Sequence, residues 1–357
     1  MKTRVAVMYG GTSEEHEVSV VSARSVLQAI DRDKYDVMPI AITKAGRWLL
    51  PSRAPDQLEP VHGSLPAVED ADGAHVAIAH EGALVSSASA PGPIDVVFCV
   101  LHGPGGEDGS MQGLFETLDV AYVGAGVAAS AVGMDKSLQK PVFAAAGIPV
   151  TPWITVREAD FARDSQTVAR AAAEQLGLPC FTKPANLGSS VGVSKCKTHD
   201  ELVAGIIAAL AHDRVALVER AITGRELECA VLGNDDPQAS VVGEVVPAHE
   251  FYDYEAKYLV EGSDLIIPAR IDDAASERIR AYALDAFRAI GCEGMARVDF
   301  FLQDDGTIYI NEINTIPGFT PISMYPKLWE ASGIPYAKLI DRLLELALER
   351  HGRRRRA

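Results

Sequence analysis

The sequence predicts a mixed architecture, in which an N-terminal doubly wound α/β domain is followed by α+β segments. Three observations support this prediction. Strand-like and helix-like patterns alternate over residues 1–124, the order typical of a parallel sheet covered by helices. Two β-rich runs flank an Asp-Gly dipeptide at residues 305–306, which indicates an antiparallel hairpin. The 357 residues are also too many for one ordinary core, so we expect two or three domains.

The first segment, residues 1–124, contains the clearest alternation. Strands are predicted at residues 4–9, 35–42 and 95–101. The last of these is a near-continuous apolar run, as in a buried parallel strand. A helix is expected after the first strand, opened by a capping box between Thr12 and Glu15. Residues 51–93 are rich in Pro, Ala, Ser and Gly, so we interpret them as a loop-heavy insertion without chemistry.

The second segment, residues 125–219, is expected to begin with a helix near Met134 that Pro141 kinks or restarts. Strands at 180–183, 191–196 and 215–219 and a helix at 200–211 complete its pattern. The third segment, residues 220–357, contains the hairpin and an amphipathic helix over about 336–350.

Composition and charge exclude several function classes. Apolar residues make up 48% of the chain and charged residues 23%, as in globular proteins. The formal net charge of −16 argues against binding nucleic acid, which needs a basic face, and no apolar run is long enough to span a bilayer. Five scattered cysteines predict reduced thiols and a cytoplasmic location. We interpret the one dense basic cluster, Arg353–Arg356, as a solvated tail.

The predicted hairpin gathers polar side chains on one face. With a two-residue type I′ turn at residues 305–306, Asp299 faces Glu312. Arg297 then faces Asn314 two positions further along. Side chains alternate along strands, so all four share a face. Two carboxylates and a carboxamide are suited to Mg²⁺ with a nucleotide phosphate. A solvated face with cross-strand ion pairs is the alternative.

Basic residues and backbone donors suggest a phosphate site elsewhere in the sequence. Lys183 ends a predicted strand and precedes a Gly-Ser loop at residues 186–192, whose amides could cover phosphates. An ordinary hairpin loop is the alternative, and the Walker A pattern is absent. Lys136, in the first turn of a helix, opposes the helix dipole unless an anion binds there.

Four further residues have weaker signals. Glu219 and Glu226 flank a short polar loop, where they could accept hydrogen bonds from a base amine and a ribose hydroxyl, although a plain connector explains them equally well. Glu17, at a helix start, and His102, at a strand end, occupy positions where open α/β domains bind ligands. The Gly-Ala-Gly at residues 124–126 resembles a dinucleotide fingerprint, but the acid expected about 20 residues later is missing, which disfavours a dehydrogenase.

Several motifs occur in one order and together resemble the D-alanine–D-alanine ligase family of the ATP-grasp superfamily. These motifs are Gly10–Ser13 with His16–Ser19, Leu101–Gly103, Met134–Lys136, Gly188–Gly192, Tyr252–Tyr258, Arg297–Asp299 and Asn311–Thr315. The resemblance implies an N-terminal substrate domain (1–124) and a two-part ATP-grasp fold with a central subdomain (125–219) and a catalytic subdomain (220–357).

The resemblance also implies roles for individual residues. The implied metal ligands are Asp299, Glu312 and Asn314. The implied phosphate contacts are Lys136, Lys183, Lys257 and Ser190. The implied adenosine contacts are Glu219, Glu226 and the backbone of Ile222. Arg297 and the Gly318 amide would stabilise an oxyanion. Substrate contacts are implied for Glu17, linked through Ser189 to Tyr258 on a lid, and for His102, Ser323 and Met324.

The implied activity is ATP-dependent joining of two D-alanines through D-alanyl phosphate, for peptidoglycan precursor synthesis. Mg²⁺ would be required, with Mn²⁺ as a substitute, in a cytoplasmic homodimer. A ligase that accepts D-lactate is the alternative within the family, and the tyrosine at position 258 favours the dipeptide. An ATP-binding module without catalysis is the alternative from another class, disfavoured by the intact metal and phosphate residues.

Overall fold

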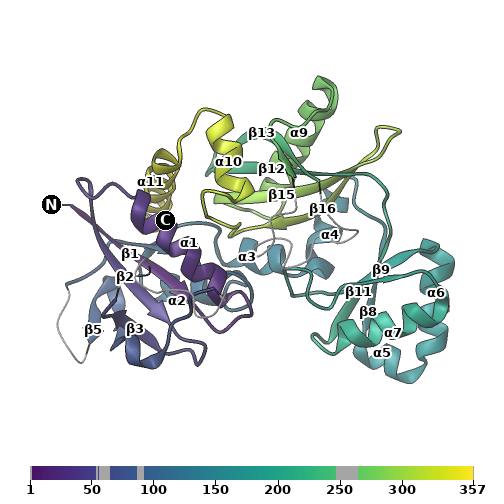
Figure 1. Cartoon of the computed structure of the whole chain (residues 1–357), viewed down its shortest axis with the longest axis horizontal. Coiled ribbons are helices and arrows are strands. Elements are labelled where there is room, and N and C mark those ends of the chain that lie inside the picture. Colours follow the sequence, from purple (N-terminus) through teal and green to yellow (C-terminus); the bar gives the residue numbers. More distant parts are fainter. Residues whose placement is uncertain (1, 54, 56–64, 87–91, 247–263, 357) are drawn as a thin grey trace.

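The chain folds around three β-sheets in a computed structural model that describes residues 2–53, 55, 65–86, 92–246 and 264–356. Figure 1 shows the N-terminal sheet at one end, the four-stranded sheet at the other, and the five-stranded sheet between them. The mixed α/β and α+β class predicted from sequence is confirmed. No helix among the described residues combines the length and apolar character needed to cross a membrane.

The first sheet has seven strands in the order β5-β4-β3-β2-β1-β6-β7. Its strands are β1 Thr3–Gly10, β2 Tyr35–Ile42, β3 Trp48–Pro51, β4 Gly73–Ile78, β5 Leu84–Ser86, β6 Val96–Cys99 and β7 Ala121–Tyr122. Strands β2, β1, β6 and β7 are parallel, as predicted, and β3 to β5 extend the sheet in antiparallel fashion. The loop-heavy insertion predicted over residues 51–93 also contains strands β4 and β5, and Val76 and Ile78 of β4 are buried in the core.

The first helix, α1 (His16–Ala29), starts later than the sequence predicted. Its N-cap is Glu15, without a side-chain capping bond, so the predicted capping box does not form. The physical reason is an extended turn after β1, in which Gly10 and Gly11 have φ values of +90° and +98°. The Ser13 hydroxyl then donates to the His102 carbonyl at 2.7 Å. The Glu15 side chain makes no capping bond to its own helix and accepts a hydrogen bond from Ser189.

The second sheet is antiparallel, with the order β10-β9-β11-β8. Its strands are β8 Trp153–Arg157, β9 Cys180–Pro184, β10 Ser194–Cys196 and β11 Val215–Arg220. Its helices are α5 Glu158–Arg163, α6 Ser165–Leu176 and α7 His199–Leu210. Apolar side chains of these helices and strands form one buried cluster, so this sheet has a core of its own.

Two helices connect the first sheet to the second. They are α3 (Val127–Met134) and α4 (Lys136–Ala145), preceded by α2 (Ser110–Thr117). The break lies at Asp135, whose carboxylate accepts a hydrogen bond from the Ser137 amide and caps α4. The helix does not restart at Pro141, because α4 already begins at Lys136 and continues through the proline; the alternative of a kink there stays a prediction.

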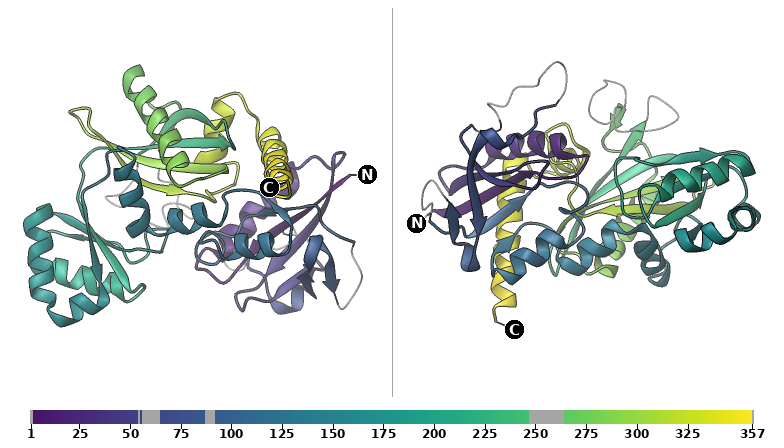
Figure 2. Two further views of the ribbon diagram at one scale, coloured as in Figure 1. Left: turned by 180° about the vertical axis from the view of Figure 1, so that it is seen from behind. Right: turned by 90° about the horizontal axis from the view of Figure 1, so that it is seen from below.

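The third sheet has the antiparallel order β14-β13-β12-β15-β16. Its strands are β12 Arg225–Gly233, β13 Gln238–Val246, β14 Asp264–Ile266, β15 Gly294–Leu302 and β16 Ile308–Asn314. Helix α9 (Asp273–Ala289) packs into one apolar cluster of this sheet, and α10 (Met324–Ala331) and α11 (Tyr336–Arg354) into another that includes the first sheet. Two views agree that α11 lies beside the first sheet (Figure 2).

The β15–β16 hairpin has the predicted facing pairs but a different turn. Gly306, at φ +81°, donates to the Gln303 carbonyl, so the turn spans residues 303–306 and the predicted two-residue turn was wrong. Next to this turn the two strands pair one residue out of the predicted register, so that Phe300 faces Ile310. Asn311 is then an extra, bulged residue on β16, and beyond it the predicted register returns, with Asp299 facing Glu312.

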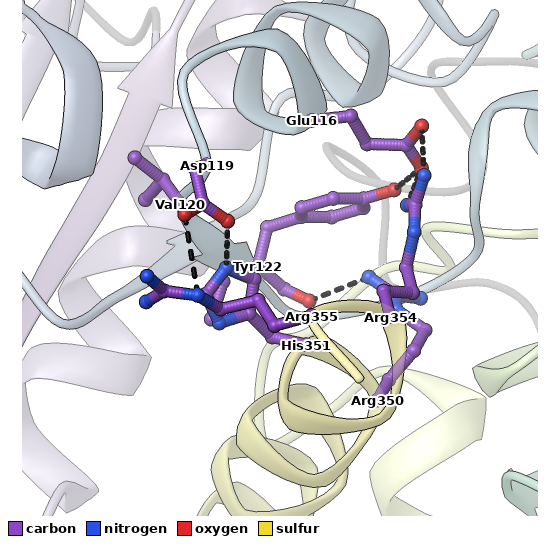
Figure 3. A pocket seen from close by; sticks show the side chains of 9 residues that line it. Glu116, Asp119, Val120, Tyr122, Arg350, His351, Arg354 and Arg355 are labelled. Carbon is purple, nitrogen blue, oxygen red and sulfur yellow. Dashed lines mark hydrogen bonds and ion pairs between the residues drawn. The ribbon is translucent and has the colours of Figure 1, made fainter. Parts of the chain in front are cut away.

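The C-terminal arginines also differ from their prediction. Helix α11 continues to Arg354, and its last turns pack against the first sheet around a cavity of about 230 Å³ (Figure 3). Arg354 pairs with Glu116, and Arg355 lies 3.3 Å from Asp119. The prediction is thus half right: Arg354 to Arg356 are exposed, but the run is helical as far as Arg354, and acidic side chains distant in sequence pair with Arg354 and Arg355.

Candidate active site

The centre of the candidate site is the face shared by β12, β15 and β16. The Arg297 guanidinium forms a two-pronged contact with Asp299 at 2.7 and 2.8 Å and lies 3.0 Å from Glu228 on β12. The Asn314 amide donates to Asp299 at 3.0 Å. Burial works against the charge of Arg297, but Asp299 and Glu228 outweigh it and raise its pKa. The predicted placement of Arg297, Asp299, Glu312 and Asn314 on one face is confirmed, and Glu228 of β12, which was not predicted, joins them.

The donor set on this face fits a hard divalent cation. Asp299 and Glu312 present carboxylates from facing positions, and Asn314 adds a carboxamide oxygen. Oxygen ligands of this kind suit Mg²⁺, which usually keeps waters and phosphate oxygens as further ligands. Within the described residues, no three His, Cys, Asp or Glu side chains form a metal site by themselves. The proposed site therefore depends on the carboxamide and on ligands from outside the protein.

Three lysines lie beside this face. Lys136, the first residue of α4, donates to the Leu187 carbonyl at 2.8 Å and lies 3.2 Å from Glu312. Lys183 on β9 lies 2.9 Å from Glu219, and Lys140 on α4 lies 3.0 Å from the other oxygen of the same carboxylate. The cationic cluster thus bridges the second and third sheets, where the sequence predicted phosphate contacts.

Glu219 is buried between two ammonium groups. Burial alone would raise the pKa of its carboxyl, but Lys140 and Lys183 bring that pKa below its usual value. Its Oε1 has Lys140 as an ionic neighbour at 3.0 Å but no partner in hydrogen-bonding geometry. A buried acceptor with unused capacity is unusual, and it suits a donor such as the amine of a nucleobase.

The Gly-Ser loop between β9 and β10 is strained. Ser189 and Ser190 have φ values of +50° and +59°, in the left-handed region that non-glycine residues seldom adopt. The Ser189 hydroxyl donates to Glu15 at 2.5 Å, which ties this loop to the N-terminal domain. These two residues form a tight turn, in which the Val191 amide donates to the Gly188 carbonyl, and the N–H groups of turns can form anion-binding concavities.

Glu15 is the functional candidate that the sequence reasoning missed. The link predicted from Glu17 through Ser189 is contradicted, because Ser189 bonds to Glu15 while Glu17 pairs with Lys44 at 2.6 Å. The late start of α1 explains why Glu15 and not Glu17 meets Ser189, since it leaves Glu15 at the N-cap and Glu17 inside the first turn. The sequence showed both glutamates near a helix start, but no local pattern distinguished them.

His102 is buried at the junction of the first and third sheets. Its Nδ1 donates to the Ile316 carbonyl at 3.0 Å, and its Nε2 accepts from the Ser22 hydroxyl at 2.9 Å. Burial lowers the pKa of His102, so the ring is neutral. Nearby, burial and then the charge of Glu15 raise the pKa of Glu107 to about 8. Glu15, whose charge acts on Glu107, is also the residue that accepts the Ser189 hydrogen bond.

The remaining predicted site residues lie on loops, on one strand and at one helix start around this face. Ile222 lies in the β11–β12 connection, and Glu226 is on β12. Gly318 lies in the half-buried loop after β16. Ser323 is the N-cap of α10 and shares a 2.8 Å hydrogen bond with Thr320, and Met324 begins that helix. Two further predicted residues, Lys257 and Tyr258, lie outside the described residues.

Two family models match the chain. The model described as "D-ala D-ala ligase N-terminus" matches residues 4–125, and "D-ala D-ala ligase C-terminus" matches residues 142–345. The D-alanine--D-alanine ligase of Geobacillus thermodenitrificans is 48% identical over 359 residues, covering 98% of this chain and 97% of that protein. The relative of the same name from Chloroherpeton thalassium is 50% identical over 364 residues, covering 99% and 98%.

Solved structures agree with the sequence comparison. The D-alanine-D-alanine ligase from Coxiella burnetii superposes with a TM-score of 0.86 at 38% identity, covering 99% of this chain and 96% of that chain. The VanG D-Ala:D-Ser ligase from Enterococcus faecalis has a TM-score of 0.85 at 34% identity, covering 97% and 100%. The predicted ATP-grasp fold is thereby confirmed, and the chain belongs to the D-alanine–D-alanine ligase family.

Proposed function

We propose that the chain joins two D-alanines in an ATP-dependent reaction that supplies a peptidoglycan precursor. The observation that carries this proposal is the placement of Asp299, Glu312 and Asn314 on one face, with Lys136 only 3.2 Å from Glu312. Metal-binding oxygens beside a phosphate-binding lysine are what phosphoryl transfer requires. The full-length relatives named D-alanine--D-alanine ligase give the substrate.

The chemistry follows from the weakness of a carboxylate as an acyl donor. An oxygen of the first D-alanine carboxylate attacks the γ-phosphorus of ATP, and ADP leaves. The amine of the second D-alanine then attacks the resulting acyl phosphate, and the C–O bond breaks to release phosphate. A divalent cation, Mg²⁺ or Mn²⁺, would offset charge on the phosphates. On this chain Asp299, Glu312 and Asn314 would hold it.

The other side chains take the roles that their positions suit. Lys136, Lys183, Ser190 and the loop amides would hold phosphates, since they surround the metal face. Lys257 would add a further phosphate contact. Glu219 would accept from the adenine amine, with the Ile222 backbone and Glu226 completing the adenosine contacts. Arg297 and the Gly318 amide would stabilise the tetrahedral oxyanion, because donors fixed in advance are most effective on developing charge.

Substrate binding is assigned to the junction with the N-terminal domain. We assign the ammonium of the first D-alanine to Glu15 in place of Glu17, because Glu15 receives the Ser189 hydroxyl. The neutral His102 would lie near the same substrate. Ser323 and Met324, at the start of α10, would receive the carboxylate of the second, since a helix N-terminus favours negative charge.

The acceptor preference belongs to the same proposal. We infer that D-alanine is used in preference to D-lactate, with Tyr258 acting on the lid side. The relatives named D-alanine--D-alanine ligase support this preference. We also propose a cytoplasmic homodimer with domains at residues 1–124, 125–219 and 220–357. Five free, buried cysteines are in keeping with a reducing compartment.

The test is phosphate release from ATP and Mg²⁺ with D-alanine, D-lactate, L-alanine or no addition. We expect release that depends on D-alanine and a product with the mass of the dipeptide. If release is equal for D- and L-alanine, the assigned stereochemistry is wrong. If an ester product dominates when D-alanine and D-lactate compete at neutral pH, the acceptor assignment is wrong.

A further inference from the structure

Lys140 is a charged residue that neither the sequence motifs nor the proposed mechanism uses. Its side chain has no exposed surface, although it carries an ammonium group. Its Nζ lies 3.0 Å from Glu219 Oε1 and 3.4 Å from the Asn311 carbonyl. A lysine this deeply buried requires a compensating partner. Glu219, the carboxylate that pairs with it, is shared with a second lysine.

Lys183 is that second lysine, and it differs from Lys140 in that its side chain is partly exposed. It lies 2.9 Å from Glu219 Oε2 and 3.4 Å from the side-chain oxygen of Asn311, and its side chain is 11% exposed. The described cluster thus holds two ammonium groups and one buried carboxylate. An excess of positive charge in a buried place fits an anionic ligand. Of the two lysines, Lys183 has access to such a ligand and Lys140 has none.

We propose that Lys140 is a positioning residue that holds Glu219 charged and in place for the nucleobase while Lys183 contacts the phosphates. This inference rests on the proposed binding of ATP. Without Lys140, the departure of Lys183 would leave Glu219 as a buried carboxylate with no counter-ion, a state that is costly. With Lys140, one lysine can leave and the carboxylate keeps a partner at 3.0 Å.

The surrounding charges are consistent with separate roles for the two lysines, Lys140 beside Glu219 and Lys183 beside the phosphates. Burial lowers the pKa of Lys140 to about 8, an effect that Glu219 opposes and Lys183 reinforces. Helix α4 supplies Lys140, β9 supplies Lys183, β11 supplies Glu219 and β16 supplies Asn311. The bulge at Asn311 in β16 therefore contributes its two oxygens to the two lysines, one to each.

The test is Lys140→Met, a neutral side chain of similar length. Lys183 still pairs with Glu219 in the unliganded variant, so we expect its melting temperature to stay at or above that of wild type. We expect the KM for ATP to rise roughly tenfold, the effect of weakening one hydrogen bond to a charged group. The KM for D-alanine should not change.

The decisive readout is the preference for ATP over purine riboside triphosphate, which lacks the exocyclic amine of adenine. Lys140→Met should reduce this preference to the value found for Glu219→Gln, and the double variant should be no worse than Glu219→Gln alone. Lys183→Met is the matched control: it should weaken both nucleotides equally and keep the preference. A wild-type preference in Lys140→Met would overturn the inference.

Two further measurements keep the result interpretable. If Lys140→Met does not fold, Lys140→Gln removes the same charge, and the same loss of preference is expected. An unchanged preference there would also overturn the inference. The proposed function is tested separately by wild type, which must release phosphate in response to D-alanine. Its failure would show in wild type, whereas failure of the Lys140 inference would show only in the variants.

Discussion

Arg350 offers a direct test of how α11 holds the first and third sheets together. Its guanidinium lies 4.2 Å from the centre of the Tyr122 ring and donates to the carbonyls of Tyr122 and Gly124. Arg350→Met removes the cation–π interaction with Tyr122, which contributes about 2 kcal/mol to stability when it is desolvated. It also leaves two buried carbonyls without this donor, at about 1 kcal/mol each. We therefore expect a loss of about 4 kcal/mol.

The assay is thermal unfolding, with Arg355→Met as the control on the same helix. At about 2–4 °C per kcal/mol, Arg350→Met should melt roughly 8–16 °C below wild type. Arg355 is 55% exposed where it pairs with Asp119, so its loss should cost at most about 1 kcal/mol. Only the contribution of the Arg355 pair should diminish in 1 M salt. If the melting temperature of Arg350→Met fell by less than about 2 °C, the reasoning would be refuted.

Three other predictions concern the site. Glu15→Gln should raise the KM for D-alanine at least tenfold through loss of the charged contact, while Glu17→Gln should change it less than about twofold; steady-state kinetics decides, and the reverse order would restore Glu17. Glu312→Gln should cut turnover by on the order of 100-fold with unchanged melting; full activity would discredit the metal assignment. Because burial raises the pKa of Glu107 from 4.5 to about 8, the folded state retains a proton that the unfolded state loses, and stability falls as pH rises through that window. Glu107→Gln should therefore gain in melting temperature relative to wild type between pH 5 and 8, and a constant difference would contradict the shift.

The hairpin shows how a sequence prediction can succeed through two compensating errors. The predicted pair of Asp299 and Glu312 is present, yet the turn is longer than predicted and a bulge at Asn311 restores the register. An Asp-Gly dipeptide favours several turns, so its type was not determined locally. The bulge could not be foreseen either, because Asn311 contacts two lysines from other elements.

Contacts between distant residues explain the other differences. The choice between Glu15 and Glu17 depends on where α1 starts, and that start depends on the bond from Ser13 to His102, 89 residues away. The arginine run carries no local sign of its partners, since Glu116 and Arg354 are 238 residues apart. The second family model ends at residue 345, before this run.

The central claim is that a D-alanine carboxylate is activated by phosphorylation before the amine attacks. The most direct test uses D-alanine labelled with ¹⁸O in both carboxylate oxygens, together with unlabelled ATP. One labelled oxygen should pass to each phosphate released, because the C–O bond of the acyl phosphate breaks when the dipeptide forms. Mass analysis of the phosphate should therefore show one ¹⁸O per dipeptide. Unlabelled phosphate accompanying dipeptide formation would contradict the account.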